Sequence, residues 1–285
     1  AVCPTPFCSP SRASMITGLY PHAHGIVANC PHRAPTNGQK GIGNEDVTTE
    51  RVLHDAGYAT KHLGKWHLAG DNLTYYPDMY RPGFEYTEEM DSIFARVRSA
   101  DPSGWMNWYT WALPVDVAPP LRQAVAALGD AWKDQRHAEF VVKMGRLELP
   151  LEQVYDLRVT DLTVDTLKTL AQRDVPFMLT CSFNGPHDPN VVPSPWYDAF
   201  EPDKIELAAN RDVREKRFEP EWSRRIVADL GEPGLREFLR IYYGTVKMLD
   251  EQVGRILETL DDCGLTDETI IIFTADHGDM AGGHG

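Results

Sequence analysis

The stretch from Leu239 to Phe273, LRIYYGTVKMLDEQVGRILETLDDCGLTDETIIIF, decides the fold of this chain. Its first part repeats apolar residues every three or four positions, which predicts a helix with one buried face, and Gly264 supplies a stop for that helix. The β-branched run Thr269–Phe273 then predicts a strand buried on both faces, as in a parallel sheet. A helix followed by a strand is the unit from which α/β proteins are built.

Two other parts of the chain repeat this pattern. The run Val175–Phe183 (VPFMLTCSF) predicts a second buried strand, and a helix from about Thr48 to Gly57 is followed by a strand at Tyr58–Leu63. The sequence therefore predicts an α/β fold with a mostly parallel central sheet flanked by helices, in one domain over residues 1–285. Residues from about 71–150 show little periodicity and predict an insertion, in which Trp105, Trp108 and Trp111 could stack on sugar or aryl rings or pack a core.

Composition limits the function. With 42% hydrophobic and 25% charged residues the chain has the composition of a soluble globular protein. Its formal net charge of −14 disfavours a general binder of nucleic acid or of anionic membranes, although a local cationic pocket is compatible with it. No apolar run approaches the roughly 20 residues of a membrane-spanning helix. The five cysteines are few and unevenly spaced, so we expect no disulfide scaffold.

Cys8 lies at the start of a predicted helix. The segment Ser9–Gly18 opens with a capping candidate, Ser9, has Pro in its first turn and closes on Gly. Exposed amides and the helix dipole would stabilise an anion at that end, and Arg12, one turn along, could donate to a tetrahedral oxyanion. Taken alone, a cysteine in this position is more often a small buried hydrophobe than a nucleophile.

The segment Cys8-Ser9-Pro10-Ser11-Arg12, followed by Thr17-Gly18, resembles the C-x-P-S-R…T-G signature of the type I sulfatases of the alkaline phosphatase superfamily. Three more segments match that family in its order: Gly64–Leu68 (GKWHL), Gly185–Pro189 (GPHDP) and Thr274–Asp279 (TADHGD). The resemblance implies an alkaline-phosphatase-like sandwich and a sulfuric ester hydrolase.

The resemblance also implies a nucleophile and its helpers. In the family a formylglycine-generating enzyme or an anaerobic sulfatase-maturating enzyme oxidises the cysteine, here Cys8, to Cα-formylglycine, whose hydrate attacks the sulfate ester. Lys65 and His67, two residues apart after a strand, would bind the sulfate, and His67 would help to break down the sulfated intermediate. His187 would be a sulfate-binding donor and an acid for the departing alcohol, and Arg12 would spread charge from the oxygens. Without the family, a surface lysine and ordinary loop or core histidines are the simpler interpretation.

Asp276 and His277 follow the predicted strand Thr269–Phe273. A carboxylate and an imidazole can hold a divalent cation, or can simply form a polar turn. The resemblance makes them metal ligands together with the modified Cys8, most often for Ca²⁺, with Mg²⁺ or Mn²⁺ as alternatives. Many sulfatases have Asn where this chain has His277.

The sequence departs from the family at both ends. Sulfatases have an acidic pair some tens of residues before the modified cysteine, whereas seven residues precede Cys8, and a later Lys that the residues after His277 do not supply. We therefore expect a piece of a longer protein that lacks an N-terminal strand and a C-terminal subdomain, and that is unstable or inactive when expressed alone. Export to the periplasm or the cell exterior, common among sulfatases, is preferred over a cytoplasmic location.

Three alternatives stay open. The first is a phosphonate or phosphate monoester or diester hydrolase of the same superfamily, and the second is a non-catalytic homologue that binds sulfated glycans. The third is a structural zinc site from Cys3, Cys8, Cys30 and His22 or His24, although the spacing lacks a C-x₂₋₄-C knuckle. The substrate would be a sulfated small molecule or glycan, and the sequence does not distinguish carbohydrate, aryl and alkyl sulfates.

Overall fold

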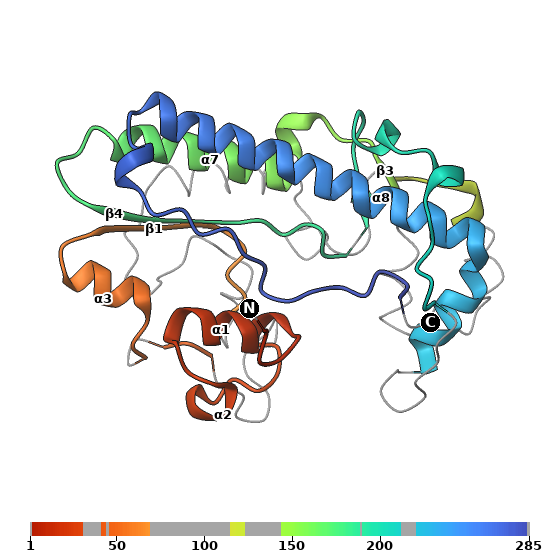
Figure 1. Cartoon of the computed structure of the whole chain (residues 1–285), viewed down its shortest axis with the longest axis horizontal. Coiled ribbons are helices and arrows are strands. Elements are labelled where there is room, and N and C mark those ends of the chain that lie inside the picture. Colours follow the sequence, from red (N-terminus) through yellow and green to blue (C-terminus); the bar gives the residue numbers. More distant parts are fainter. Residues whose placement is uncertain are drawn as a thin grey trace, which may run out of the picture. The chain divides into compact units, whose positions relative to one another are not determined.

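The computed structural model describes residues 2–30, 41–43, 46–68, 115–122, 144–188, 190–211 and 221–283 (Figure 1). The chain divides into two compact units. The first comprises residues 1–100, 155–184 and 253–279, and the second comprises 101–154, 185–252 and 280–285. Most of the predicted insertion at 71–150, with Trp105, Trp108 and Trp111, lies outside the described residues.

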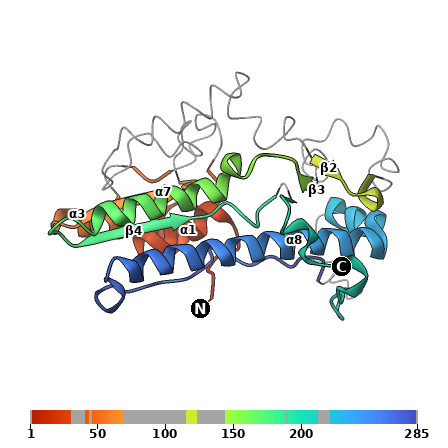
Figure 2. The ribbon, with the colours of Figure 1, turned by 90° about the horizontal axis from the view of Figure 1, so that it is seen from above.

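The first unit is built on two parallel strands, β1 (Ala59–Gly64) and β4 (Phe177–Ser182). Helix α7 (Tyr155–Leu170) covers one face of this pair, and α3 (Thr49–Asp55) and α1 (Cys8–Thr17) lie on the other side (Figure 1). Seen from above, α7 runs along β4 (Figure 2). The helix and strand predicted between residues 48 and 63 and the strand predicted within 175–183 are confirmed.

Helix α7 packs through a face that mixes apolar and threonine side chains. Leu157, Leu167 and Leu170 are buried, as are Thr160 and Thr163. Each of these threonines donates its hydroxyl to the backbone oxygen four residues earlier, at 2.9 Å and 2.7 Å, so neither brings an unpaired polar group into the core. The helix therefore covers the sheet although its sequence lacks a purely apolar stripe.

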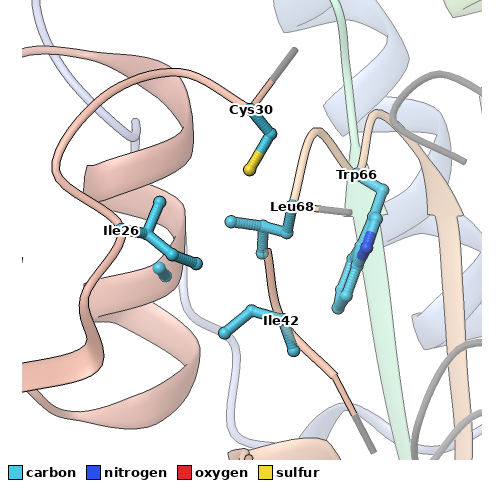
Figure 3. Close-up of a cluster of buried hydrophobic side chains, with 6 residues drawn as sticks. Ile26, Cys30, Ile42, Trp66 and Leu68 are labelled. Atoms are coloured by element: carbon cyan, nitrogen blue, oxygen red, sulfur yellow. The ribbon is translucent and has the colours of Figure 1, made fainter. Parts of the chain in front are cut away.

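A small apolar core joins α1 to the loop that follows β1. It consists of side chains from four separate segments: Ala13, Ile26, Cys30, Ile42, Trp66 and Leu68. Figure 3 shows this cluster, with all of these residues except Ala13 labelled. Helix α2 (Pro21–His24) lies between the first two of these segments. Because Trp66 and Leu68 flank His67, this core holds the loop after β1 against the helix that begins at Cys8.

The strand predicted at Thr269–Phe273 is wrong in this structure. After the short helix η7 (Thr266–Glu268) these residues are extended but belong to no sheet, and Ile270 and Phe273 are 89% and 83% exposed. A strand needs a neighbour to complete its hydrogen-bond ladder, and among the described residues none pairs with this segment. Strand β4 is also only partly buried, rather than buried on both faces.

The second unit contains a three-stranded sheet. Strand β3 (Gly145–Leu147) pairs antiparallel with β2 (Val115–Val117) and parallel with β5 (Val191–Val192). Three single-turn helices accompany it: η4 (Leu151–Gln153), η5 (Tyr197–Ala199) and η6 (Pro202–Lys204).

Helix α8 (Glu221–Asp262) contains the helix predicted at residues 239–260, which is confirmed. A kink interrupts it near its start, where Gly231 has φ 59° and ψ −178° and is followed by Pro233. Residues 221–252 of α8 belong to the second unit and the remainder to the first. No helix among the described residues combines the length and the apolar character needed to cross a bilayer.

Candidate active site

Cys8 is the first residue of α1 and is buried. The N-cap residue is Phe7, which makes no side-chain capping bond, so the prediction of Ser9 as the cap is wrong. Ser9 lies inside the helix, and its hydroxyl donates to the backbone oxygen of His67 at 2.6 Å. The same hydroxyl accepts the amide of Cys30 at 2.9 Å. Ser9 thus fixes the helix beside Cys8 to the loop after β1.

The first-turn amides of α1 are mostly engaged, which corrects the expectation that they face an anion. The Ser9 amide donates to Asn29 Oδ1 at 3.0 Å, the Ser11 amide donates to the Phe7 oxygen at 3.1 Å, and Pro10 has no amide hydrogen. Positive charge beside Cys8 must therefore come mainly from side chains.

Arg12 supplies part of that charge and is held in place by three groups. Its Nε donates to Asp276 Oδ2 at 2.8 Å, and its Nη1 donates to the Lys65 oxygen at 3.0 Å and to Ser182 Oγ at 2.9 Å. Among the described residues nothing accepts from Nη2, so that edge of the guanidinium can still meet a ligand. The guanidinium donors that we expected to meet an oxyanion are thus divided. Nε and Nη1 bind protein groups, and Nη2 remains available for a ligand.

Lys65 and His67 are both buried, whereas their residue types alone suggest a surface lysine. Lys65 Nζ lies 3.5 Å from Cys8 Sγ. Strand β1 ends at Gly64, and the chain then turns, with φ of 92° at Gly64 and 58° at His67. The two side chains therefore reach the same place through a strained turn and not through strand alternation.

Burial governs the titration of both groups. It lowers the pKa of Lys65; the Cys8 sulfur opposes this shift, and Arg12 adds to it. Burial also lowers the pKa of His67, against the raising effect of its hydrogen bond with Cys8, while Lys65 lowers it further. His67 is therefore a neutral imidazole near pH 7, which is the form that can accept a proton.

Asp276 and His277 lie directly beside Cys8. His277 Nε2 is 3.3 Å from Cys8 Sγ, and the Asp276 backbone oxygen accepts the hydroxyl of Ser11. His277 Nδ1 is 2.9 Å from the Gly278 oxygen, which can only accept, so the proton sits on Nδ1 and the Nε2 lone pair faces the sulfur. Metal-binding histidines are typically oriented in this way.

Neighbouring groups shift the pKa values of both Asp276 and His277. Burial would raise the pKa of Asp276, but Arg12, His277 and Lys65 outweigh it and leave that pKa lowered, so the carboxylate is ionised at neutral pH. Burial lowers the pKa of His277, yet the bonds to Gly278 and Cys8 and the charge of Asp276 raise it overall.

The residues fit a bound divalent cation. Cys8, Asp276 and His277 each present one ligand atom, and these atoms lie within 4.8 Å of one another. A carboxylate oxygen and an imidazole nitrogen with its other nitrogen satisfied are ordinary metal ligands. The alternative zinc site is not formed among the described residues, where the ligand atoms that gather closely enough are those of Cys8, Asp276 and His277, and not those of Cys3, Cys30, His22 or His24.

His187 belongs to the second unit and is described separately. It lies in the loop after β4, where Gly185–Pro186 is a cis peptide bond. Its Nδ1 is 2.7 Å from the Asp188 oxygen and 3.1 Å from the Asp188 carboxylate, and its side chain is partly exposed. Its predicted role in sulfate binding stays a prediction.

Sequence reasoning missed several residues that shape the site. Ser182 binds Arg12, Asn29 accepts the amide of Ser9, and His62 lies 2.9 Å from the Lys65 oxygen. Ser182 had one available signal, because it ends β4 opposite Gly64 and parallel strands place their carboxyl ends together. Asn29 and His62 carry no such signal.

Comparison with known proteins places this geometry in a family. The chain is 27% identical to the ulvan-active sulfatase of Formosa agariphila over 99% of its own length and 43% of that protein. It is 28% identical to the choline-sulfatase of Rhizobium meliloti over 99% of its own length and 50% of that protein. The chain thus spans about half the length of the curated relatives it matches.

A solved structure shares the fold. The phosphonate monoester hydrolase of Agrobacterium radiobacter matches with a TM-score of 0.66 and 23% identity, over 99% of this chain and 55% of that one. The sequence model of the family named Sulfatase matches residues 1–285. With the motif residues gathered around Cys8, this match shows that the chain belongs to the sulfatase family.

Proposed function

We propose that the protein hydrolyses sulfate esters to an alcohol and inorganic sulfate, with Cys8 as the precursor of the nucleophile. One observation carries the proposal: Lys65 Nζ and His277 Nε2 lie 3.5 Å and 3.3 Å from Cys8 Sγ, while Arg12 pairs with Asp276 at 2.8 Å. Two cationic side chains and a pair of candidate metal ligands around one buried cysteine suit a sulfate ester, which carries one negative charge, and the sulfate dianion released from it.

The nucleophile is proposed to be the hydrate of formylglycine, formed after a maturation enzyme oxidises Cys8. A hydrate has two hydroxyl groups on one carbon, whereas a thiol has a single reactive group. The first hydroxyl attacks sulfur and expels the alcohol, which leaves with a proton. Loss of the proton from the second hydroxyl then re-forms the aldehyde and expels sulfate, so no water has to attack sulfur.

Arg12 and Lys65 would neutralise the sulfate oxygens during this displacement. Such donors stabilise charge best when they are fixed before the reaction begins. Three bonds fix Arg12, and burial fixes Lys65.

His67 is the proposed base for the second step. Its lowered pKa leaves it neutral, and its interaction with Cys8 puts it beside the side chain that would carry the hydroxyl groups. His187 would protonate the leaving alcohol, as the family resemblance implies.

Asp276 and His277 would hold a divalent cation together with an oxygen of the modified Cys8. We propose Ca²⁺, with Mg²⁺ or Mn²⁺ as alternatives, because oxidation replaces the sulfur donor by oxygen, which hard cations prefer. When bound, the ion would supply Lewis-acid stabilisation of the nucleophile and of the sulfate oxygens.

The substrate is proposed to be a sulfated small molecule or glycan. The names of the two relatives, an ulvan-active sulfatase and a choline-sulfatase, cover both kinds of substrate. A formylglycine-generating or anaerobic sulfatase-maturating enzyme is the proposed partner, and the periplasm or the cell exterior is the proposed location.

Mass spectrometry of the peptide containing Cys8 tests the nucleophile. When the natural full-length protein is produced with a formylglycine-generating enzyme, this peptide should become about 18 Da lighter, because sulfur and two hydrogens leave and one oxygen enters. The peptide containing Cys263 is the control and should keep its mass. Persistent absence of the lighter peptide would overturn the assignment of Cys8.

Turnover of matched substrates tests the reaction. The matured protein should hydrolyse an aryl sulfate faster than the matching aryl phosphonate monoester, and Cys8→Ala should abolish both activities while Cys263→Ala does not. Faster phosphonate turnover would favour the alternative hydrolase, and binding of sulfated glycans without any turnover would favour the non-catalytic alternative.

A further inference from the structure

The backbone oxygen of Lys65 receives two hydrogen bonds from parts of the chain far apart in sequence. Arg12 Nη1 donates to it at 3.0 Å, and His62 Nε2 lies 2.9 Å from it. A carbonyl oxygen can only accept, so this contact places the imidazole proton on Nε2. One oxygen therefore links β1, which carries His62, to the guanidinium beside Cys8.

His62 is itself held firmly. It is buried on β1 opposite Thr180 of β4, and the Trp66 ring meets its imidazole edge-on, with centroids 5.1 Å apart at 90°. Trp66 belongs to the apolar core in Figure 3. The ring of His62 therefore has little freedom to turn away from the Lys65 oxygen.

The turn that His62 supports carries two active-site side chains in an unfavourable backbone shape. His67 has φ 58°, a conformation that a residue with a Cβ keeps only when its surroundings impose it. The surroundings do so at three points: the Lys65 amide donates to Ser182 O at 2.8 Å, the Lys65 oxygen accepts from His62, and the His67 oxygen accepts from Ser9.

We infer that His62 is a positioning residue, which holds the Lys65 carbonyl so that the Arg12 guanidinium and the Lys65 ammonium face Cys8 in fixed places. This inference rests on the proposed function. No motif of the sequence includes His62, and it acts through the Lys65 carbonyl. Losing the donor would let the carbonyl and the guanidinium shift, which weakens charge stabilisation in the transition state more than substrate binding.

Substitutions that keep or remove the donor test this role in the matured full-length protein. His62→Leu removes it, His62→Gln keeps an N–H near the position of Nε2, and His62→Asn offers an N–H that is too short to reach. We expect kcat to fall about tenfold in the Leu and Asn variants, the loss of one hydrogen bond, with little change in KM. The Gln variant should stay within about threefold of the unsubstituted protein.

The comparison of Gln with Asn decides the question even if the Leu variant does not fold, because both amides are polar and similar in shape. Equal kcat in the Gln and Asn variants would overturn the inference, and so would equal kcat in the Leu variant and the unsubstituted protein. His54→Gln, on the exposed side of α3, is the matched control and should leave kcat unchanged.

A second measurement does not depend on turnover. In protein labelled with ¹⁵N-arginine, the Arg12 Nε–H should exchange with water about tenfold faster in the Leu and Asn variants than in the Gln variant, because the guanidinium is less firmly held. Equal exchange rates would overturn the inference. If no variant hydrolyses a sulfate ester but this difference persists, the proposed function fails while the positioning role of His62 stands.

Discussion

At the scale of single residues, Glu50 is a buried acidic residue that has no part in the candidate active site. It is 1% exposed on α3, and its Oε2 has no hydrogen-bond partner among the described residues. Burial raises the pKa of its carboxyl, against smaller lowering effects from its own backbone and from Thr48. Because the pKa is higher in the folded state, this group contributes stability at low pH, and that contribution is lost as pH rises above about 4.3 and through the folded pKa.

Glu50→Gln should therefore stabilise the protein at neutral pH and have little effect in acid. We expect the free energy of unfolding to rise by about 1–2 kcal/mol near pH 7.5, since the amide carries no charge to desolvate. Urea unfolding near pH 7.5 and near pH 4 measures the difference. Glu258→Gln, at an exposed position of α8, is the control and should change neither value. A gain of equal size at both pH values would contradict the assignment.

Asp276 combines two roles, since it pairs with Arg12 and presents an oxygen beside Cys8 and His277. Asp276→Asn should lower the affinity for Ca²⁺ at least about a hundredfold and abolish turnover, because an amide offers one weaker ligand oxygen and no charge. Calorimetric titration with Ca²⁺ measures the first effect in the matured full-length protein. Asp279→Asn, three residues away and exposed, is the control. Unchanged Ca²⁺ affinity in Asp276→Asn would remove this residue from the metal site.

At the scale of secondary-structure elements, the junction of β1 and β4 positions Arg12, Lys65 and Ser182 together. Gly64 ends β1 with φ 92°, and a Cβ at this position would collide with the backbone carbonyl of Ser182. Gly57 has the same φ of 92° but has nothing within 4 Å of such a Cβ. The two glycines therefore separate the cost of backbone strain from the cost of a collision within the sheet.

Gly64→Ala should destabilise the protein clearly more than Gly57→Ala. We expect about 1 kcal/mol for strain alone at Gly57 and at least about 3 kcal/mol at Gly64, where the strands must also move apart. Thermal unfolding of both variants measures the difference. Because the moved strand ends carry Lys65 and Ser182, Gly64→Ala should also reduce turnover of the matured full-length protein. Equal destabilisation by the two substitutions would show that the contact with Ser182 is unimportant.

At the scale of the whole molecule, the exposed run Thr269–Phe273 is the largest departure from the expected fold. Ile270 and Ile272 are 89% and 81% exposed, and the segment is extended without a partner. An extended apolar segment with unpaired backbone groups is a template for association with other chains. The 285-residue chain should therefore tend to aggregate through this segment.

Replacing Ile270 and Ile272 by Lys should reduce that aggregation. The charges would oppose pairing between copies, so we expect the soluble fraction after gentle heating to increase several-fold. Light scattering of the 285-residue chain measures the effect. Val2→Lys, at another exposed apolar residue, controls for charge alone and should have little influence. An equal improvement from Val2→Lys would show that charge, and not this segment, governs aggregation.

The sequence by itself indicated the residues of the candidate site and most of the described elements. Four family segments marked Cys8, Arg12, Lys65, His67, His187, Asp276 and His277 as one site. The structure brings all of them except His187 together within the first unit, and His187 belongs to the second unit. Apolar periodicity located α3, α8, β1 and β4, because a helix or a strand that packs on a core must repeat its buried residues.

Only the tertiary structure decided how the site is held. Ser182 and Asn29 reach Arg12 and α1 from distant parts of the sequence, and packing sets such partners. His62 is only three residues from Lys65, but their contact depends on the turn that the chain makes after β1. The tertiary structure also showed that the amides at the start of α1 are engaged and that Thr269–Phe273 forms no strand. The physical reason is the same in both cases: whether a backbone group is free or paired depends on which neighbour lies beside it, and local sequence does not encode that neighbour.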